Sequence, residues 1–138
     1  MEFDSILLLR VASVTDKVDH PQFFDPPYTL KYLQAGLQQD PALTVHLLDG
    51  WITPRSVAQL LDYTASIWPD LIVISASSFD VDVSNAFVAA LKKHPHAPLV
   101  IGIGQGHYLN RDTKNGCEAL YDAILLGEPE EELFNLLA

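Results

Sequence analysis

Three apolar runs without polar alternation dominate the pattern of this chain. They are Leu71–Ser78, Leu99–His107 and Asp122–Glu130, and each of them ends in small or polar residues. Strands that are apolar at every position are buried on both faces, which indicates a parallel sheet covered by helices. Because such sheets bind ligands outside the carboxyl ends of their strands, we expect a large ligand to approach these three ends.

The rest of the pattern supplies two more strands and the helices between them. The expected strands are Ile6–Val11 and Leu43–Leu48 before the first run, Leu71–Ser75 and Leu99–Ile103 within the first two runs, and Ala123–Leu126 within the third. The expected helices are Thr29–Gln39, a helix from Thr53 to Trp68, Asp82–His94, a short segment at 113–121, and Pro129–Ala138. Thr53 is predicted as an N-cap with Pro54 at the first helical position.

Five strands that alternate with helices define an α/β fold. Right-handed crossovers favour a three-layer, flavodoxin-like (Rossmann-like) parallel five-stranded sheet in the order 2-1-3-4-5. The 138 residues are expected to form one domain, 1–138. The loops after Val11, Ser77 and Gly104 would then converge at the switch point between the first and third strands.

Charge and cysteine content exclude several classes of function. The chain has 8 Lys and Arg against 18 Asp and Glu, a net charge of −10, which disfavours binding to nucleic acid or to an anionic membrane surface. No apolar run reaches the roughly 20 residues of a transmembrane helix. The single Cys117 excludes an internal disulfide and a multi-cysteine metal or iron–sulfur site. The histidines lack metal-ligand spacing, so no metal site is predicted. The expected compartment is cytoplasmic.

The third strand ends in hydroxyl residues that suit ligand binding. Ser75 and Ser77 follow a wholly apolar strand at the edge where ligands bind, and small hydroxyl side chains both leave room and form hydrogen bonds. The alternative is that these serines only cap the turn or the helix that follows.

The fourth strand ends in repeated glycine. Gly102, Gly104 and Gly106 allow backbone to approach a flat ligand without an intervening Cβ, and His107 next to them could donate a hydrogen bond. A glycine-rich turn with a surface histidine is the alternative. The spacing does not match a dinucleotide fingerprint, because the glycines follow the fourth strand rather than the first.

The fifth strand ends in Gly127 and Glu128, where the carboxylate could hold a ligand group or complement the dipole of the last helix. Nucleophilic catalysis is not indicated, since there is no G-x-S-x-G elbow and no His partner for the cysteine. No catalytic residue is predicted in this chain.

These elements together resemble the cobalamin-binding domain at the N-terminus of many radical S-adenosylmethionine enzymes. The matching motifs are Pro26-Pro27-Tyr28-Thr29-Leu30-Lys31-Tyr32-Leu33, the strand ending Val45–Asp49, Pro69–Ser75, Gly102–His107 and Gly127–Glu130. The 26 residues between Ser75 and Gly102 suit the family. The Asp-x-His-x-x-Gly loop of the methionine synthase and mutase group is absent, and His20 is a poor axial ligand for cobalt, which favours the radical S-adenosylmethionine branch.

The resemblance implies that cobalamin binds at Ser75, Ser77, the Gly102–His107 segment, Gly127 and Glu128. It also implies a catalytic radical S-adenosylmethionine domain in the same polypeptide, with a four-iron four-sulfur cluster and S-adenosylmethionine in that part only. This chain would be the N-terminal part of a longer methyltransferase or radical-rearrangement enzyme, without catalysis of its own.

Three other functions use the same fold. A cofactor-free interaction or scaffolding domain is the main alternative, because Gln105 and Pro129 replace glycines of the family pattern. A signalling receiver would need a phospho-acceptor Asp after the third strand, where this chain has Ser. A flavin mononucleotide carrier would need glycine in the loop after the first strand, where Ala12–Asp16 has none.

Overall fold

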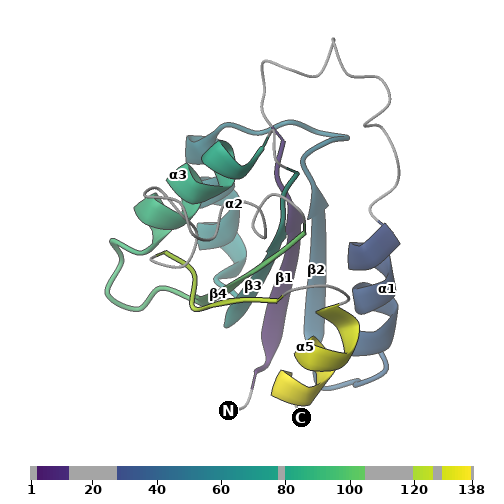
Figure 1. Ribbon diagram of the computed structural model, residues 1–138. Helices are drawn as coiled ribbons and strands as arrows, with labels where there is room; N and C mark the ends of the chain where they lie inside the picture. Colours follow the sequence, from purple (N-terminus) through teal and green to yellow (C-terminus); the bar gives the residue numbers. More distant parts are fainter. Residues whose placement is uncertain (1–2, 13–27, 78–79, 105–119, 126–128, 138) are drawn as a thin grey trace.

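The computed structural model describes residues 3–12, 28–77, 80–104, 120–125 and 129–137. Within them, five parallel strands form one sheet in the predicted order β2-β1-β3-β4-β5. The strands are β1 (Ser5–Arg10), β2 (Thr44–Asp49), β3 (Leu71–Ser75), β4 (Leu99–Ile103) and β5 (Ala123–Ile124). This is the flavodoxin-like arrangement that the sequence predicts. Because all pairs are parallel, the carboxyl ends of the strands share one edge of the sheet, toward which β1, β2 and β3 run upward in Figure 1.

Helices cover both faces of the sheet. One face carries α1 (Tyr28–Leu37) and α5 (Pro129–Leu137), and the other carries α2 (Val57–Ile67) and α3 (Val81–Leu91), as Figure 1 shows. Successive residues of a strand point to opposite faces, so each strand supplies both halves of the core. Leu7, Leu9, Ile72 and Ile74 are buried against α2 and α3, whereas Ile6, Leu8, Leu71 and Val73 are buried against α1 and α5.

At the amino edge of the sheet, two aspartates hold the starts of neighbouring strands. Asp70, just before β3, accepts hydrogen bonds on Oδ2 from the backbone N–H groups of Asp4 (2.8 Å) and Ser5 (3.0 Å). Asp122, just before β5, accepts on Oδ2 from the N–H of Val100 (2.7 Å) and from Nζ of Lys92 (2.6 Å). Each carboxylate therefore satisfies donors that the parallel ladder leaves unpaired where a strand begins.

Helix α2 begins later than the sequence predicted. The N-cap is Ser56, not Thr53, and it forms a capping box: Ser56 Oγ accepts from Gln59 N (3.2 Å) and Gln59 Oε1 from Ser56 N (2.9 Å). A reciprocal capping box satisfies two donors, whereas a threonine cap satisfies one. The backbone N–H of Thr53 is instead bonded to the carbonyl of Asp49, which holds residue 53 in the turn after β2.

Two helix ends also differ from the prediction. Trp68, expected as the last residue of this helix, is instead its left-handed C-cap (φ 38°) and is 37% exposed, with its ring against His94. Helix α3 ends at Leu91 rather than at His94, because the N–H groups of Lys93 and His94 turn to carbonyls three residues back as the chain nears Pro95. The segment expected at 113–121 lies, except for its last two residues, outside the described residues.

Candidate functional site at the carboxyl edge of the sheet

Four residues form a row across the carboxyl edge of the sheet. Asp49 of β2, Arg10 of β1, Ser75 of β3 and Ile103 of β4 are partners in strand register. Residues paired in register project to the same face, and Ile103 belongs to the core beneath α1 and α5. The four side chains therefore project on the α1/α5 side of the sheet.

Ser75 and Gly104, both predicted as site residues, lie close together. Gly104 has a φ of +93°, and a Cβ built on it would stand 3.1 Å from the carbonyl oxygen of Ala76 and 3.3 Å from Ser75 Oγ. Only glycine adopts this conformation without strain, so the end of β4 approaches β3 with no side chain between them. The structure thus explains why glycine stands at position 104.

The Ser75 hydroxyl is available to a ligand. No hydrogen bond of its side chain occurs within the described part of the chain. No buried side-chain oxygen there lacks a partner, so Ser75 Oγ is in contact with solvent. A hydroxyl that is both open and fixed at a strand end can donate to a ligand and accept from it.

Ser77, two residues further on, has a different environment. Its Oγ donates to Asp80 Oδ2 at 2.9 Å, and its carbonyl accepts from the N–H of Asp80 at 3.1 Å. These bonds close the turn before α3 and leave Asp80 only 4% exposed. Ser77 thus makes the turn contacts of the alternative described above, and its contact with a ligand stays a prediction.

Of the remaining predicted residues, Gly102 is the one that the structure describes. Gly102 lies inside β4, buried, with Ile74 and Ile124 as its register partners. Since Ile74 faces the α2/α3 core, Gly102 faces the side of the sheet opposite Ser75. Gly106, His107, Gly127 and Glu128 lie outside the residues that the structure describes.

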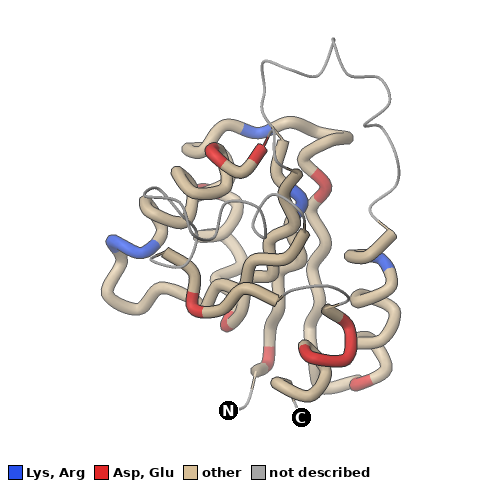
Figure 2. Tube along the Cα trace, viewed as in Figure 1, with Lys and Arg blue, Asp and Glu red and all other residues tan. Residues whose placement is uncertain are grey.

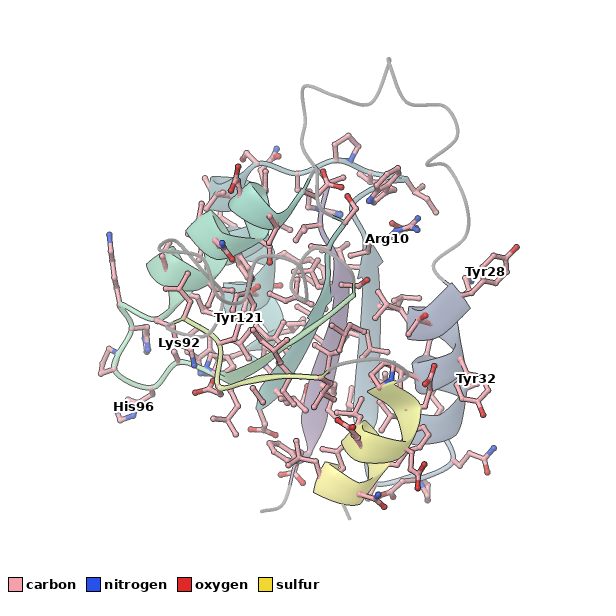
Figure 3. The ribbon with its side chains drawn as sticks, in the orientation of Figure 1. Arg10, Tyr28, Tyr32, Lys92, His96 and Tyr121 are labelled. Carbon is pink, nitrogen blue, oxygen red and sulfur yellow. The ribbon has the colours of Figure 1, made fainter. Side chains whose placement is uncertain are left out.

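Arg10 is a member of the edge that the sequence analysis missed. Its Nε and Nη2 donate to Asp49 Oδ1 and Oδ2, both at 2.8 Å, and its guanidinium lies 5.1 Å from the centre of the Trp51 ring. Trp51 is itself anchored, because its Nε1 donates to the carbonyl of Val11 at 3.1 Å. Figure 3 shows Arg10 at the upper end of the sheet. One arginine closing an otherwise apolar strand was the signal in the sequence.

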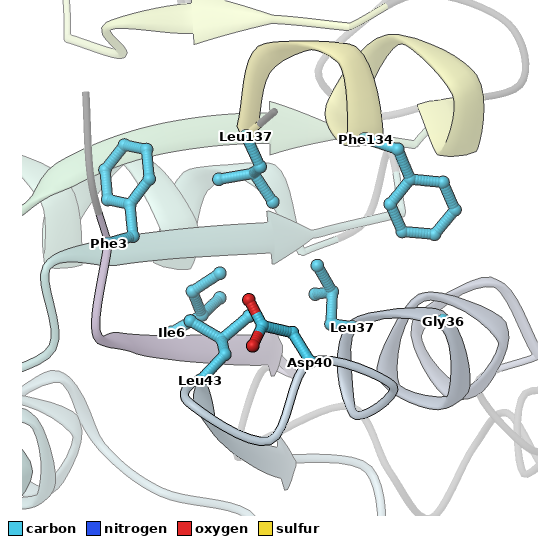
Figure 4. A pocket seen from close by; sticks show the side chains of 8 residues that line it. All are labelled: Phe3, Ile6, Gly36, Leu37, Asp40, Leu43, Phe134 and Leu137. Carbon is cyan, nitrogen blue, oxygen red and sulfur yellow. The ribbon is translucent and has the colours of Figure 1, made fainter.

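A cavity of about 170 Å³ lies at the other end of the molecule, between β1, α1 and α5 (Figure 4). Its lining consists of Phe3, Ile6, Gly36, Leu37, Asp40, Leu43, Phe134 and Leu137. Asp40 is the one charged residue in this lining, and its Oδ1 is hydrogen-bonded to the N–H of Ala42. None of the predicted site residues lines the cavity.

Charge is distributed unevenly over the described elements. The first turn of α5 carries Glu130, Glu131 and Glu132, and Figure 2 shows acidic positions along that helix. Of the basic residues in the described segments, Arg10 is the one carried on a strand of the sheet. The same segments contain no group of three or more His, Cys, Asp or Glu arranged to hold a metal ion.

Comparison with known proteins supports the fold. No family model and no curated protein sequence matches the chain. Among solved structures, it is similar to the pseudo-receiver domain of CikA, with a TM-score of 0.53 and 19% identity over 96% of this chain and 93% of that one. It is also similar to OxsB, a cobalamin-dependent S-adenosylmethionine radical enzyme, with a TM-score of 0.63 and 13% identity over 99% of this chain. The chain spans 18% of OxsB, and identities this low establish the fold alone.

The end of β3 lacks the group that phosphoryl transfer to a receiver needs. A receiver has a phospho-acceptor Asp at the end of its third strand, and here β3 ends in Ser75.

Among the helices that the structure describes, none has the length and apolar character needed to cross a membrane.

Proposed function

We propose that this chain is a cobalamin-binding module that serves a radical S-adenosylmethionine catalytic domain in the same cytoplasmic polypeptide. The observation that carries the proposal is the open Ser75 hydroxyl beside Gly104 at the junction of β3 and β4. A large ligand with a long tail needs a strand end free of side chains and a hydrogen-bond partner within it, and this junction offers both. The likeness to OxsB over nearly the whole chain is consistent with the proposal.

In this proposal the residues of the module bind and orient the cofactor, and they carry out no catalysis themselves. Ser75 supplies the hydrogen bond and Gly104 admits the tail. The other residues contribute as the family resemblance implies: Ser77, Gly102, Gly106, His107, Gly127 and Glu128. Bound cobalamin would supply a cobalt centre that carries a methyl group or starts a rearrangement. The iron–sulfur cluster and S-adenosylmethionine would belong to the rest of the polypeptide.

Retention of hydroxocobalamin tests the proposal directly. The protein is mixed with excess hydroxocobalamin, desalted, and examined for a shifted visible spectrum at about one cobalamin per chain. Ser75→Ala removes a hydroxyl that has no partner in the described protein, so it should leave the fold unchanged and weaken binding roughly three- to tenfold.

Ser66→Ala is the matched control, because Ser66 lies on the exposed side of α2 and its Oγ donates to the carbonyl of Tyr63, its one hydrogen bond among the described residues. It should leave cobalamin affinity unchanged. A folded wild-type protein that retains no cobalamin would contradict the proposal.

The second candidate is a cofactor-free interaction domain. Arg10, Asp49 and Trp51 contact one another across the ends of β1 and β2, and these contacts hold that part of the edge without a ligand. The similarity to the pseudo-receiver domain of CikA is consistent with this candidate, since the name of that domain mentions no cobalamin. A folded protein without cobalamin retention would favour this candidate.

A further inference from the structure

The guanidinium of Arg10 is held in one orientation by its neighbours. Asp49 receives two of its N–H groups, and the Trp51 ring lies within cation–π distance. Asp49 Oδ1 also accepts the backbone N–H of Trp51 at 3.0 Å, which ties the carboxylate to the turn after β2. The Arg10 side chain is 15% exposed, so it is neither fully buried nor free to move in solvent.

One nitrogen of this guanidinium remains unused. Nε and Nη2 are engaged by Asp49, and Nη1 makes no hydrogen bond within the described residues. No buried side-chain nitrogen there lacks a partner, so Nη1 reaches solvent. The planar geometry of the group directs the two N–H bonds of Nη1 away from Asp49.

Arg10, which carries the unused donors, is next to the proposed ligand site in strand register. Arg10 and Ser75 are register partners on adjacent strands, and both side chains project on the α1/α5 side of the edge. The edge thus presents two N–H groups and one hydroxyl with no competing partner in the described chain. Charged N–H donors and a hydroxyl side by side are the chemistry that binds a phosphate group.

We propose that Arg10 Nη1 and Ser75 Oγ form an anion subsite that binds the phosphodiester of the nucleotide tail of cobalamin. This inference rests on the proposed function and assigns one part of the ligand to one pair of residues. In a chain with a net charge of −10, an anionic group needs charged donors nearby, and Arg10, whose other two nitrogens are paired with Asp49, offers the N–H groups of Nη1 on the sheet itself. Because Asp49 and Trp51 already fix the guanidinium, binding would lose little side-chain entropy.

The test compares two corrinoids and two variants. Cobinamide lacks the nucleotide tail and its phosphodiester, whereas cobalamin has both. Arg10→Gln removes the proposed donor charge, and Lys92→Gln removes the same charge from the Lys92–Asp122 pair at the opposite edge of the sheet. Urea unfolding of both variants first establishes that each is folded.

We expect Arg10→Gln to weaken cobalamin binding roughly tenfold and to leave cobinamide binding within a factor of about two. Lys92→Gln should change neither affinity. As a second measurement, the ³¹P NMR signal of bound cobalamin should move in Arg10→Gln, measured at saturating protein, and stay in place in Lys92→Gln. If cobinamide binds too weakly to measure, the ³¹P signal alone tests whether Arg10 contacts the phosphodiester.

The outcomes separate this inference from the proposed function. If the wild type binds cobalamin and Arg10→Gln binds it equally well with an unmoved ³¹P signal, the subsite is wrong and the proposed function stands. An equal loss of both corrinoids in Arg10→Gln would also overturn the subsite, since it would point to a general distortion of the edge. If the wild type binds neither corrinoid, the proposed function fails and the subsite fails with it.

Discussion

The ring of Phe134 on α5 lies against the bare Cα of Gly36 on α1. A Cβ at position 36 would stand 2.5 Å from Phe134 Cζ, closer than real contacts allow. The glycine therefore lets the two helices on one face of the sheet approach each other. This contact also forms one wall of the cavity shown in Figure 4.

Gly36→Ala should destabilise the protein by about 1–2 kcal/mol, because overpacking against Phe134 outweighs the helix-propensity gain of roughly 1 kcal/mol. In a Phe134→Ala background the same change should be stabilising, since the clash is gone. Urea unfolding of the four proteins of this double-mutant cycle measures the sign. The same sign in both backgrounds would show that Phe134 does not determine the residue at position 36.

Gly104→Ala should cost about 1–2 kcal/mol of unfolding free energy, because alanine at φ +93° is strained and its Cβ would press on the Ala76 carbonyl. Valine at this position would add a larger side chain to the same strain, so alanine is the cleaner probe. Denaturant unfolding provides the measurement, with Ser75→Ala as the neighbouring variant expected to be neutral. A Gly104→Ala variant as stable as the wild type would argue against the left-handed conformation.

Asp49→Asn should destabilise the protein by roughly 2 kcal/mol, because the new amide group turns N–H toward the N–H of Arg10 Nη2 in a pair that is mostly shielded from water. Asp62→Asn on the exposed side of α2 is the control and should have little effect. Both are measured by urea unfolding. A loss of unfolding free energy below about 0.3 kcal/mol would show that the Arg10–Asp49 pair, like many exposed ion pairs, contributes negligibly to stability.

Asp70→Ala should cost about 1–2 kcal/mol, because two backbone N–H groups at the start of β1 lose their acceptor. Asp70→Asn keeps an acceptor oxygen and should cost less. Hydrogen exchange at the amides of Asp4 and Ser5 gives a local readout, and both should exchange faster in the alanine variant. Unchanged protection would mean that water replaces the carboxylate without loss.

Much of the fold could be predicted because its signals are local. The unbroken apolar runs at β3 and β4 require burial on both faces, and only a parallel sheet between helices provides it. The handedness of the crossovers then leaves few strand orders. The start of α2 was wrong by three residues because Thr53-Pro54 and Ser56–Gln59 are both valid start signals, and the hydrogen bonds of the Asp49 turn decide between them.

The site was less predictable because its geometry depends on contacts between distant segments. Ser75 and Gly104 were predicted and do meet, since the ends of adjacent strands must converge. The bond from Ser77 to Asp80 depends on how the turn closes, which residue types alone do not determine. Arg10 was overlooked because its partner Asp49 is 39 residues away and only strand pairing places them together.

The aspartates that precede β3 and β5 fix the strands at the amino edge of the sheet, whereas the proposed ligand site lies at the carboxyl edge. By holding the first residues of β1 and β4, Asp70 and Asp122 set the register before the chain reaches the ligand edge. Loops after the strands can then be lengthened, shortened or exchanged without shifting a strand past its neighbour. This fold should therefore serve as a scaffold on which new loops are grafted onto one edge while the opposite edge keeps the strands in line.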